Sequence, residues 1–217
     1  MGRPSTDTKS KLLLTAKDLI WQSSYGFVSV DDICKAAGIK KGSFYYYFSS
    51  KAELAVAVME ESYQGYESEI IDLFTPNITP VERFENLAEF IYEKQKQAYN
   101  KYGRVCGCPF ASLGSEMAGN EELIQKKADE ILHRQGNMFK ETIREMVDSG
   151  LLPVQTDIAN TGSQIITSIL GQVMVARIQN NLSNLKKDVK LSLFQTLGLE
   201  THIPGTNTML QEQHNDQ

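Results

Sequence analysis

Apolar residues recur three and four positions apart along most of this 217-residue chain, the spacing that puts them on one face of an α-helix. Glycine, proline and capping residues divide the pattern into segments. We therefore predict an all-α protein with a short helix starting at Lys40 or Lys41. The other predicted helices span residues 8–24, 30–37, 52–74, 80–102, 109–119, 120–149, 156–181 and 185–197.

The segment from Ser29 to Lys51 predicts two short helices, a tight turn between them and the start of a third helix. Ser29 and Asp32 have the spacing of a capping box, and Gly38 supplies the left-handed residue that ends the first helix. Two short helices joined at a glycine turn commonly present the second helix to a DNA groove. We therefore expect a helix-turn-helix.

Positive charge gathers at the starts of the next two helices, at Lys40, Lys41 and Lys51. Cations there oppose the helix dipole, so an anionic partner is expected. Lys51 at a helix N-terminus has the chemistry of a phosphate clamp. Phe44 and Phe48 share one face and are predicted to be core.

Net charge is −5, but its distribution is uneven. Residues 1–51 carry eight basic and four acidic side chains, +4, which leaves −9 for the remainder. A basic head on an acidic body can approach DNA through one face only. Residues 2–4 form a polar lead-in that either places Arg3 in a minor groove or is a disordered tail.

More than a dozen residues agree in register with one known signature. They are Gly26, Ser29, Val30, Ile33, Ala36, Ala37, Gly38, Ile39, Gly42, Ser43, Phe44, Tyr45, Phe48, Lys51 and Leu54. This pattern resembles the DNA-binding signature of the TetR/AcrR transcriptional regulators. The resemblance implies phosphate contacts at Ser29, Tyr47 and Lys51. It implies base or groove contacts at Lys41, Gly42, Ser43 and Tyr46.

Two positions depart from the family pattern, because Lys40 stands where a Ser or Thr cap is usual and Cys34 where Ala is usual. Lys40 could add a phosphate contact or alter base preference. The predicted DNA-binding set comprises Arg3, Ser29, Lys40, Lys41, Gly42, Ser43, Tyr45, Tyr46, Tyr47 and Lys51.

Cys106 and Cys108 precede Pro109, which suits the first position of a helix and puts Cys108 at the N-cap. The helix dipole and nearby Arg104 are expected to lower the pKa of the Cys108 thiol. Residues 107–110 also resemble a motif of some TetR/AcrR regulators that sense electrophiles through a cysteine. The alternative is that Cys108 is a small apolar side chain lining a pocket.

The remaining helices predict a body that binds a ligand and forms a dimer. The candidate pocket residues are Tyr63, Tyr66, Phe90, Cys106, Cys108, Phe110, Met117, Met138, Met174 and Arg177. The candidate dimer interface, a four-helix bundle with the symmetry mate, comprises Ile158, Gly162, Ile165, Ile169, Val173, Val189, Leu193, Phe194 and Leu197. The alternative is that this seam closes an internal core.

Together these features predict a head over residues 1–51, a body over 52–199 and a disordered tail over 200–217. The expected function is a homodimeric repressor that binds a palindromic double-stranded DNA operator and is released by a small molecule or an electrophile. The alternatives are a thiol-based enzyme using Cys108 and an architectural DNA-binding protein without a ligand.

The histidines show no zinc-like spacing, so no metal or cofactor is expected. Without a membrane span or signal sequence, the cytoplasm is expected.

Overall fold

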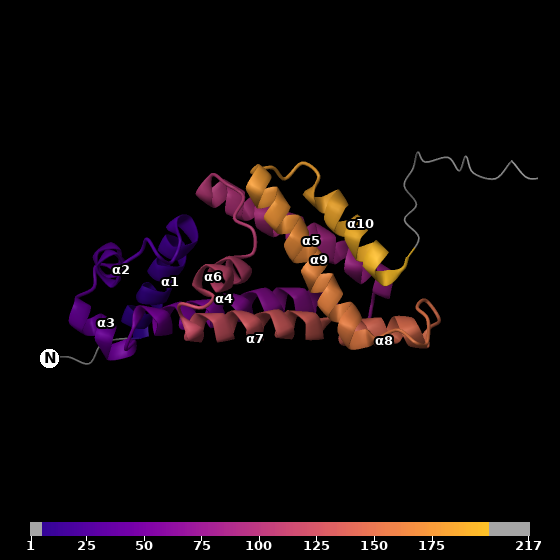
Figure 1. The fold of residues 1–217 in the computed structure, drawn as a ribbon, viewed down its shortest axis with the longest axis horizontal. Helices are drawn as coiled ribbons and strands as arrows, with labels where there is room; N and C mark the ends of the chain where they lie inside the picture. The colour runs from indigo at the N-terminus through magenta and orange to yellow at the C-terminus, as the bar shows by residue number, and fades with distance from the viewer. Residues whose placement is uncertain (1–5, 200–217) are drawn as a thin grey trace, which may run out of the picture.

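The computed structural model describes residues 6–199, and every regular element in that range is a helix, which confirms the all-α prediction (Figure 1). Arg3 and the predicted tail over 200–217 lie outside the described residues. The helices are α1 (Thr6–Ser23), α2 (Val30–Ala37), α3 (Lys41–Tyr47), α4 (Lys51–Leu73), α5 (Pro80–Tyr102), α6 (Pro109–Met117), α7 (Glu122–Met138), α8 (Lys140–Asp148), α9 (Ile158–Gln179) and α10 (Leu185–Leu197).

Helices α1, α2 and α3 gather at one end of the molecule (Figure 1). α4 leaves this head and runs beside α7, and α8 continues the line of α7. α9 packs across α7 with α10 beside it, and α10 also packs on α5. The head therefore connects to the body through the long helix α4.

Local sequence signals set most helix ends. Ser29 accepts the backbone N–H of Asp32 at 3.1 Å, and the Asp32 carboxylate accepts the Ser29 N–H at 2.9 Å, which confirms the capping box. Gly38 adopts φ +66°, as the end of α2 requires. α1 ends at Ser23, one residue before the predicted end, and the next residue, Ser24, has a positive φ of 124°.

The predicted single helix over 120–149 is wrong, because it breaks at Phe139 between α7 and α8. The Phe139 ring is fully buried, with its centroid 5.3 Å from that of Phe74 and 5.9 Å from that of Phe84. Aromatic clusters of this geometry add to the stabilisation from burial. The break thus coincides with the insertion of Phe139 into a cluster between α4, α5 and α7.

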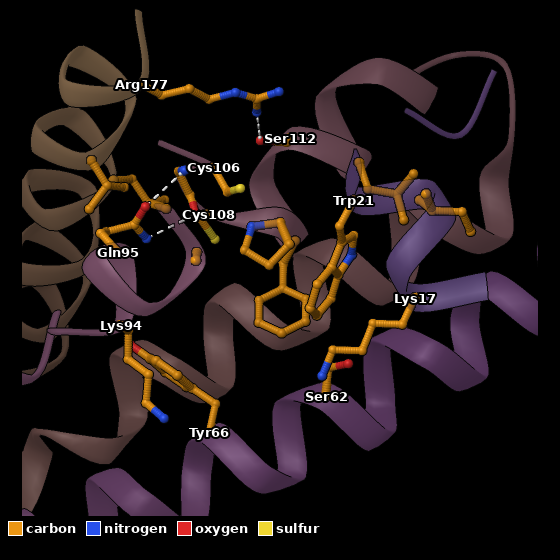
Figure 2. A pocket seen from close by; sticks show the side chains of 18 of the residues that line it. Lys17, Trp21, Ser62, Tyr66, Lys94, Gln95, Cys106, Cys108, Ser112 and Arg177 are labelled. Atoms are coloured by element: carbon orange, nitrogen blue, oxygen red, sulfur yellow. Dashed lines mark hydrogen bonds between the residues drawn. The ribbon is translucent and has the colours of Figure 1, made fainter. Parts of the chain in front are cut away.

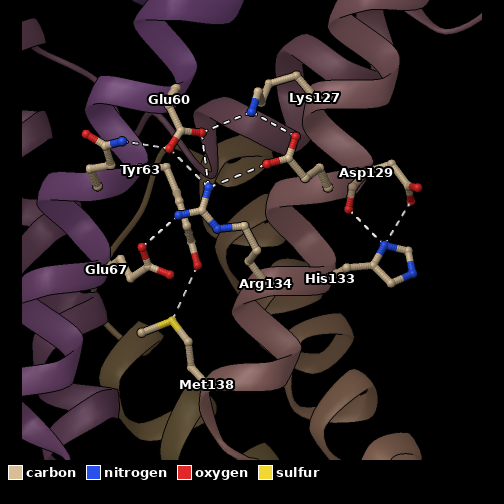
Figure 3. Close-up of polar contacts among 10 residues, drawn as sticks. Glu60, Tyr63, Glu67, Lys127, Asp129, His133, Arg134 and Met138 are labelled. Carbon is tan, nitrogen blue, oxygen red and sulfur yellow. Dashed lines mark hydrogen bonds and ion pairs between the residues drawn. The ribbon is translucent and has the colours of Figure 1, made fainter.

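α4 is held to α7 by a half-buried ion-pair network (Figure 3). The Arg134 guanidinium of α7 donates to Glu60 at 3.0 Å and to Glu67 at 2.8 Å, both on α4. Lys127 adds a 3.0 Å contact to Glu60. The same guanidinium lies 4.3 Å from the ring centroid of Tyr63. Glu60 pairs with both Lys127 and Arg134, and Arg134 pairs with both Glu60 and Glu67. A network of this kind fixes α4 against α7 more firmly than isolated surface ion pairs would.

The predicted dimer residues are mostly part of the internal core of one chain. Ile158 is partly buried, and the other members are buried: Gly162, Ile165, Ile169, Val173, Val189, Leu193, Phe194 and Leu197. They pack where α9 meets α7, α8 and α10, and where α10 meets α5. These side chains therefore pack in the core of one chain, which favours the internal alternative.

Gly162 shows why small residues occur in this seam. A Cβ added there would lie 2.5 Å from the carbonyl oxygen of Gly136 on α7. The backbones of α7 and α9 thus cross in contact, and the glycine that suggested a dimer seam serves this internal crossing.

Candidate DNA-binding surface and ligand cavity

α3 presents a polar and aromatic face to solvent. Phe44 and Phe48 are buried in the head core, as predicted, while Tyr45 and Tyr46 are 51% and 56% exposed. Lys40 at the start of the helix is exposed, and no side chain caps that start. The Tyr47 ring is half-buried, with its centroid 4.9 Å from that of Tyr46.

Lys41 extends from α3 to α2, where its ammonium lies 2.8 Å from the Asp31 carboxylate. This contact raises the pKa of Lys41, first through the hydrogen bond and then through the charge of Asp31. Both side chains are more than half exposed. An exposed pair of this kind contributes little to stability, so Lys41 can exchange Asp31 for another anion.

Lys51 is placed differently from the predicted phosphate clamp. Its ammonium donates to the carbonyl oxygens of Tyr25 at 3.0 Å and Val28 at 2.8 Å, and lies 3.9 Å from the ring centroid of Tyr25. Burial lowers its pKa. The structure therefore gives Lys51 a role within the chain, since it anchors the loop between α1 and α2 to the start of α4.

Glu116 of α6 holds the same loop from the side of the body. Its carboxylate accepts the backbone N–H of Gly26 at 2.8 Å and that of Tyr25 at 3.3 Å. A Cβ on Gly26 would lie 3.2 Å from this carboxylate, so glycine suits the close approach. Through these bonds, a movement of α6 is transmitted to the loop that precedes the helix-turn-helix.

The C-terminal half of α1 also contacts the body through polar groups. The Asp18 carboxylate accepts from the Lys101 ammonium at 2.6 Å and from the Tyr102 hydroxyl at 2.9 Å. Arg104 donates to the carbonyls of Trp21 and Gln22 near the end of α1. Arg104 therefore holds the end of α1, and it is not among the groups that lower the pKa of the Cys108 thiol, contrary to the prediction.

A cavity of about 430 Å³ lies between the head and the body. α1 forms one wall, and α4, α5, α6, α7 and α9 form the others. Figure 2 shows Lys17 and Trp21 of α1 across the cavity from Tyr66 and Gln95. Both its size and its mainly apolar lining are typical of small-molecule sites.

The structure places half of the predicted pocket set in the lining, namely Tyr66, Cys106, Cys108, Phe110 and Arg177. The other half lies outside it and is corrected: Tyr63, Phe90, Met117, Met138 and Met174. Tyr63 is fully buried, and its hydroxyl contacts the Met138 sulfur at 3.5 Å in the contact between α4 and α7. Met174 packs beside Gly107, behind the lining.

Sequence reasoning missed Lys17, Trp21, Gln95 and Gln135 as lining residues. The Gln95 amide holds the loop before α6, because it donates to the Gly107 carbonyl and accepts the Gly107 N–H, both at 3.0 Å. Lys17 and Trp21 are four residues apart on α1 and therefore lie on one face of the helix. Nothing local indicated that this face meets the body.

Cys108 occupies the N-cap of α6 as predicted, but the expected direction of its pKa is wrong. Burial raises the pKa of the Cys108 thiol more than the backbone N–H groups of Ala111 and Phe110 lower it. Burial likewise raises the pKa of Cys106, against the lowering effect of Arg104 and Arg177. The thiolate form is thus disfavoured at both positions.

We expect Cys108 to alkylate slowly. In a variant that carries Cys34→Ser and Cys106→Ser, iodoacetamide at pH 7.4 should label Cys108 at least about tenfold more slowly than free cysteine, since its thiolate fraction is smaller and access is restricted. The rate should rise with pH beyond the range where free cysteine has levelled off. Labelling as fast as free cysteine would restore the reactive-thiol hypothesis.

The thiol-enzyme alternative pairs Cys108 with a histidine, and the one histidine of the described region lies elsewhere. His133 lies on the surface of α7 with its Nδ1 atom 2.9 Å from the Asp129 carbonyl oxygen, and it does not line the cavity. His202 and His214 lie outside the described residues. Within residues 6–199 there is also no cluster of three metal-ligating side chains, and no helix there is long and apolar enough to cross a membrane.

Two family models match the chain. The model described as bacterial regulatory proteins of the tetR family matches residues 12–58, and the tetracyclin repressor-like C-terminal domain matches residues 81–189, just over half of the chain.

Similar proteins agree with these matches. An uncharacterized HTH-type transcriptional regulator of Lactococcus lactis is 25% identical over 85% of this chain and 91% of its own length. The Escherichia coli repressor NemR is 26% identical over 57% of this chain and 60% of its own length. In fold, the reduced form of E. coli NemR superposes with a TM-score of 0.74 at 20% identity, over 89% of this chain and 96% of that chain. A TetR-family regulator from Agrobacterium tumefaciens superposes with a TM-score of 0.75 at 18% identity, over 87% of this chain and 97% of that chain. This chain therefore belongs to the TetR family of bacterial regulatory proteins.

Proposed function

We propose that this protein is a homodimeric repressor that binds a palindromic DNA operator and leaves it when a small organic molecule enters the cavity. The observation that carries the proposal is the position of the cavity, whose walls belong to head helix α1 and to body helices. A ligand there contacts both parts at once. It can therefore favour one head arrangement over another, which is the condition for a ligand to shift a conformational equilibrium.

Two routes connect the cavity to the head. α6 contributes Cys108 and Phe110 to the lining and reaches the α1–α2 loop through Glu116. α4 contributes Tyr66, and its first residue, Lys51, anchors the same loop. Because both routes end on one loop, a small shift of either helix changes the tilt of α2 and α3.

On DNA, α3 would enter the major groove, with bases read from Lys41, Gly42, Ser43 and Tyr46. Contacts to phosphates would come from Ser29, Lys40 and Tyr47, with Tyr45 beside them and Arg3 in the adjacent minor groove. Exposure of Lys40, Tyr45 and Tyr46 supports this assignment. Lys51 contributes to it chiefly by positioning the loop.

The dimer would use the outer face of α9 in place of the buried seam. Thr167, Gly171, Val175 and Ile178 are exposed along one side of that helix, and Ile178 is 81% exposed. An exposed apolar stripe of this kind is typical of an interface. A two-fold axis there would place two α3 helices on successive half-sites.

An architectural DNA-binding protein without a ligand would be expected to have a fully packed body. The cavity therefore argues against that alternative. The raised pKa values of Cys106 and Cys108 argue against release by an electrophile. A reversibly bound ligand is therefore the favoured effector.

The DNA assignment is tested by comparing Lys40→Ala with Tyr46→Ala on an operator selected from random DNA. Lys40→Ala should weaken binding to all sequences alike and reduce the salt slope by roughly 2, since a dimer loses two phosphate contacts at about 0.9 each. Tyr46→Ala should change the preference at one position of each half-site. Fluorescence anisotropy at several salt concentrations measures both effects. Equal loss of specificity in the two variants would contradict the assignment.

A further inference from the structure

The lining of the cavity contains a cation without an acidic partner. Lys17 is half-buried on α1 and forms no ion pair with any described residue. Its ammonium lies 4.7 Å from the ring centroid of Trp21. The adjacent carboxylate of Asp18 is already occupied by Lys101 and Tyr102. Burial, followed by the charge of Lys101, lowers the pKa of Lys17. An anion beside Lys17 would therefore reduce the free-energy cost of keeping its ammonium charged.

The other charged groups of the lining are largely satisfied. Glu69 pairs with Lys94 at 2.5 Å, and Glu116 accepts two backbone N–H groups. Among the described residues, Arg177 donates to the neutral Ser112 hydroxyl and forms no ion pair. Glu61 also lines the cavity, is exposed and forms no ion pair with a described residue, and its charge acts to raise the pKa of Lys17. The lining therefore carries four basic side chains, Lys17, Lys94, Arg104 and Arg177, against three acidic ones, Glu61, Glu69 and Glu116, and its charge is net positive.

A buried amide also faces this space. Gln135 of α7 is 5% exposed and lines the cavity, and its side chain makes no hydrogen bond with another described residue. The Tyr66 hydroxyl likewise has no partner among the described residues. Every fully buried side-chain nitrogen and oxygen of the described residues has a hydrogen-bond partner, so the Gln135 amide and the Tyr66 hydroxyl are open to the cavity and can bond a polar part of a bound molecule.

The remaining lining is aromatic and aliphatic. Trp21, Tyr66 and Phe110 supply ring surface, and Ile91, Ile169 and Val173 supply aliphatic surface. The volume of about 430 Å³ holds a molecule with one or two rings.

We infer that the effector is an aromatic carboxylic acid with a second hydrogen-bonding group. Its carboxylate would lie at Lys17, its ring against Trp21, Tyr66 and Phe110, and its second polar group at Gln135. The inference rests on the proposed function for the identity of the site, and it adds the chemical class of the ligand. Because Lys17 belongs to α1, the anion would be held by the head, while Gln135 would hold the other end to the body.

The chain provides its own reporter, because Trp21 is its single tryptophan and lines the cavity. The probe is 3-(4-hydroxyphenyl)propanoate, compared with its neutral amide and with the corresponding cationic propylamine. Trp21 fluorescence, excited at 295 nm in full-length protein without DNA, reports binding of each. The acid should bind at least about tenfold more tightly than the amide and the amine, as a charge-assisted contact predicts.

Two variants locate the contacts. Lys17→Met keeps the aliphatic stem and should bring the acid and the amide to within about twofold of each other, whereas Lys17→Arg should retain the preference. Lys9→Met is the matched control, because Lys9 is exposed on the same helix and does not line the cavity. Gln135→Met should remove the affinity difference between the probe and 3-phenylpropanoate, which lacks the phenol group.

The outcomes separate this inference from the proposed function. Equal binding of acid and amide, preference for the amine, or no binding by any probe would overturn the assignment of an aromatic acid, whatever the protein does on DNA. Preference for the acid that survives Lys17→Met would overturn the site. Binding of the acid with both variant effects would support the inference. Operator affinity that stays unchanged in saturating acid would then refute release by the ligand alone.

Discussion

Lys51→Met should lower the thermal stability of the protein in the absence of DNA. The substitution keeps the stem of the side chain but removes the ammonium donor from the carbonyls of Tyr25 and Val28, of which the Tyr25 carbonyl keeps the backbone N–H of Val28. Hydrogen bonds from a charged group contribute about 1.5–3 kcal/mol, so a loss of about 2 kcal/mol is expected. For a chain of this size, Tm should fall by roughly 4–8 °C in a calorimetric scan.

Lys40→Ala is the control for this prediction. Lys40 is exposed and caps no group through its side chain, so its removal should leave Tm unchanged while reducing the salt dependence of DNA binding. If Lys51→Met behaved like Lys40→Ala, with unchanged Tm and a smaller salt slope, Lys51 would be a simple phosphate contact. The hydrogen bonds from Lys51 to the α1–α2 loop would then contribute nothing measurable to the stability of the fold.

Gly162→Ala should be strongly destabilising although alanine is the better helix former. The added Cβ would lie 2.5 Å from the Gly136 carbonyl oxygen, a backbone atom that moves only with α7. Overpacking of this kind costs about 1–3 kcal/mol, and more where the backbone must shift. Because Gln135 adjoins Gly136, the same displacement should weaken ligand binding at the cavity.

Gly65→Ala provides the contrast. Gly65 lies inside α4, and an added Cβ meets no atom within 4 Å. Its replacement should raise stability by up to about 1 kcal/mol through helix propensity alone. Urea unfolding of the two variants at matched protein concentration measures the difference. A neutral Gly162→Ala would mean that α7 and α9 do not cross as closely as the structure places them.

The helices themselves could be predicted from the sequence because their ends are set by local chemistry. The capping boxes at Ser29 and Thr79, and the left-handed glycines Gly38 and Gly103, act within four residues of where they stand. The same holds for the N-cap position of Cys108. The break at Phe139 escaped prediction because its cause is an aromatic cluster contributed by distant parts of the chain.

The candidate site was predicted in part. Tyr66, Cys108 and Phe110 could be named because they lie on helices already assigned to the body. Lys17 and Gln135 could not, since a helical pattern gives the buried face but not the helix that covers it. The predicted direction of the Cys108 pKa shift was wrong for a related reason. The helix N-terminus lowers this pKa locally, but burial by residues distant in sequence raises it more.

The sequence by itself determined where the helices begin and end, that the second and third form a helix-turn-helix, and that positive charge collects there. These properties depend on residues within a few positions of one another, so they can be predicted from the sequence. The tertiary structure alone decided that the α9 and α10 seam is internal, that Lys51 anchors a loop, and that α1 adds to the cavity wall a lysine with no ion pair in residues 6–199. Each of these depends on which surfaces meet across many residues, and amphipathic helices of similar period can be packed together in more than one way.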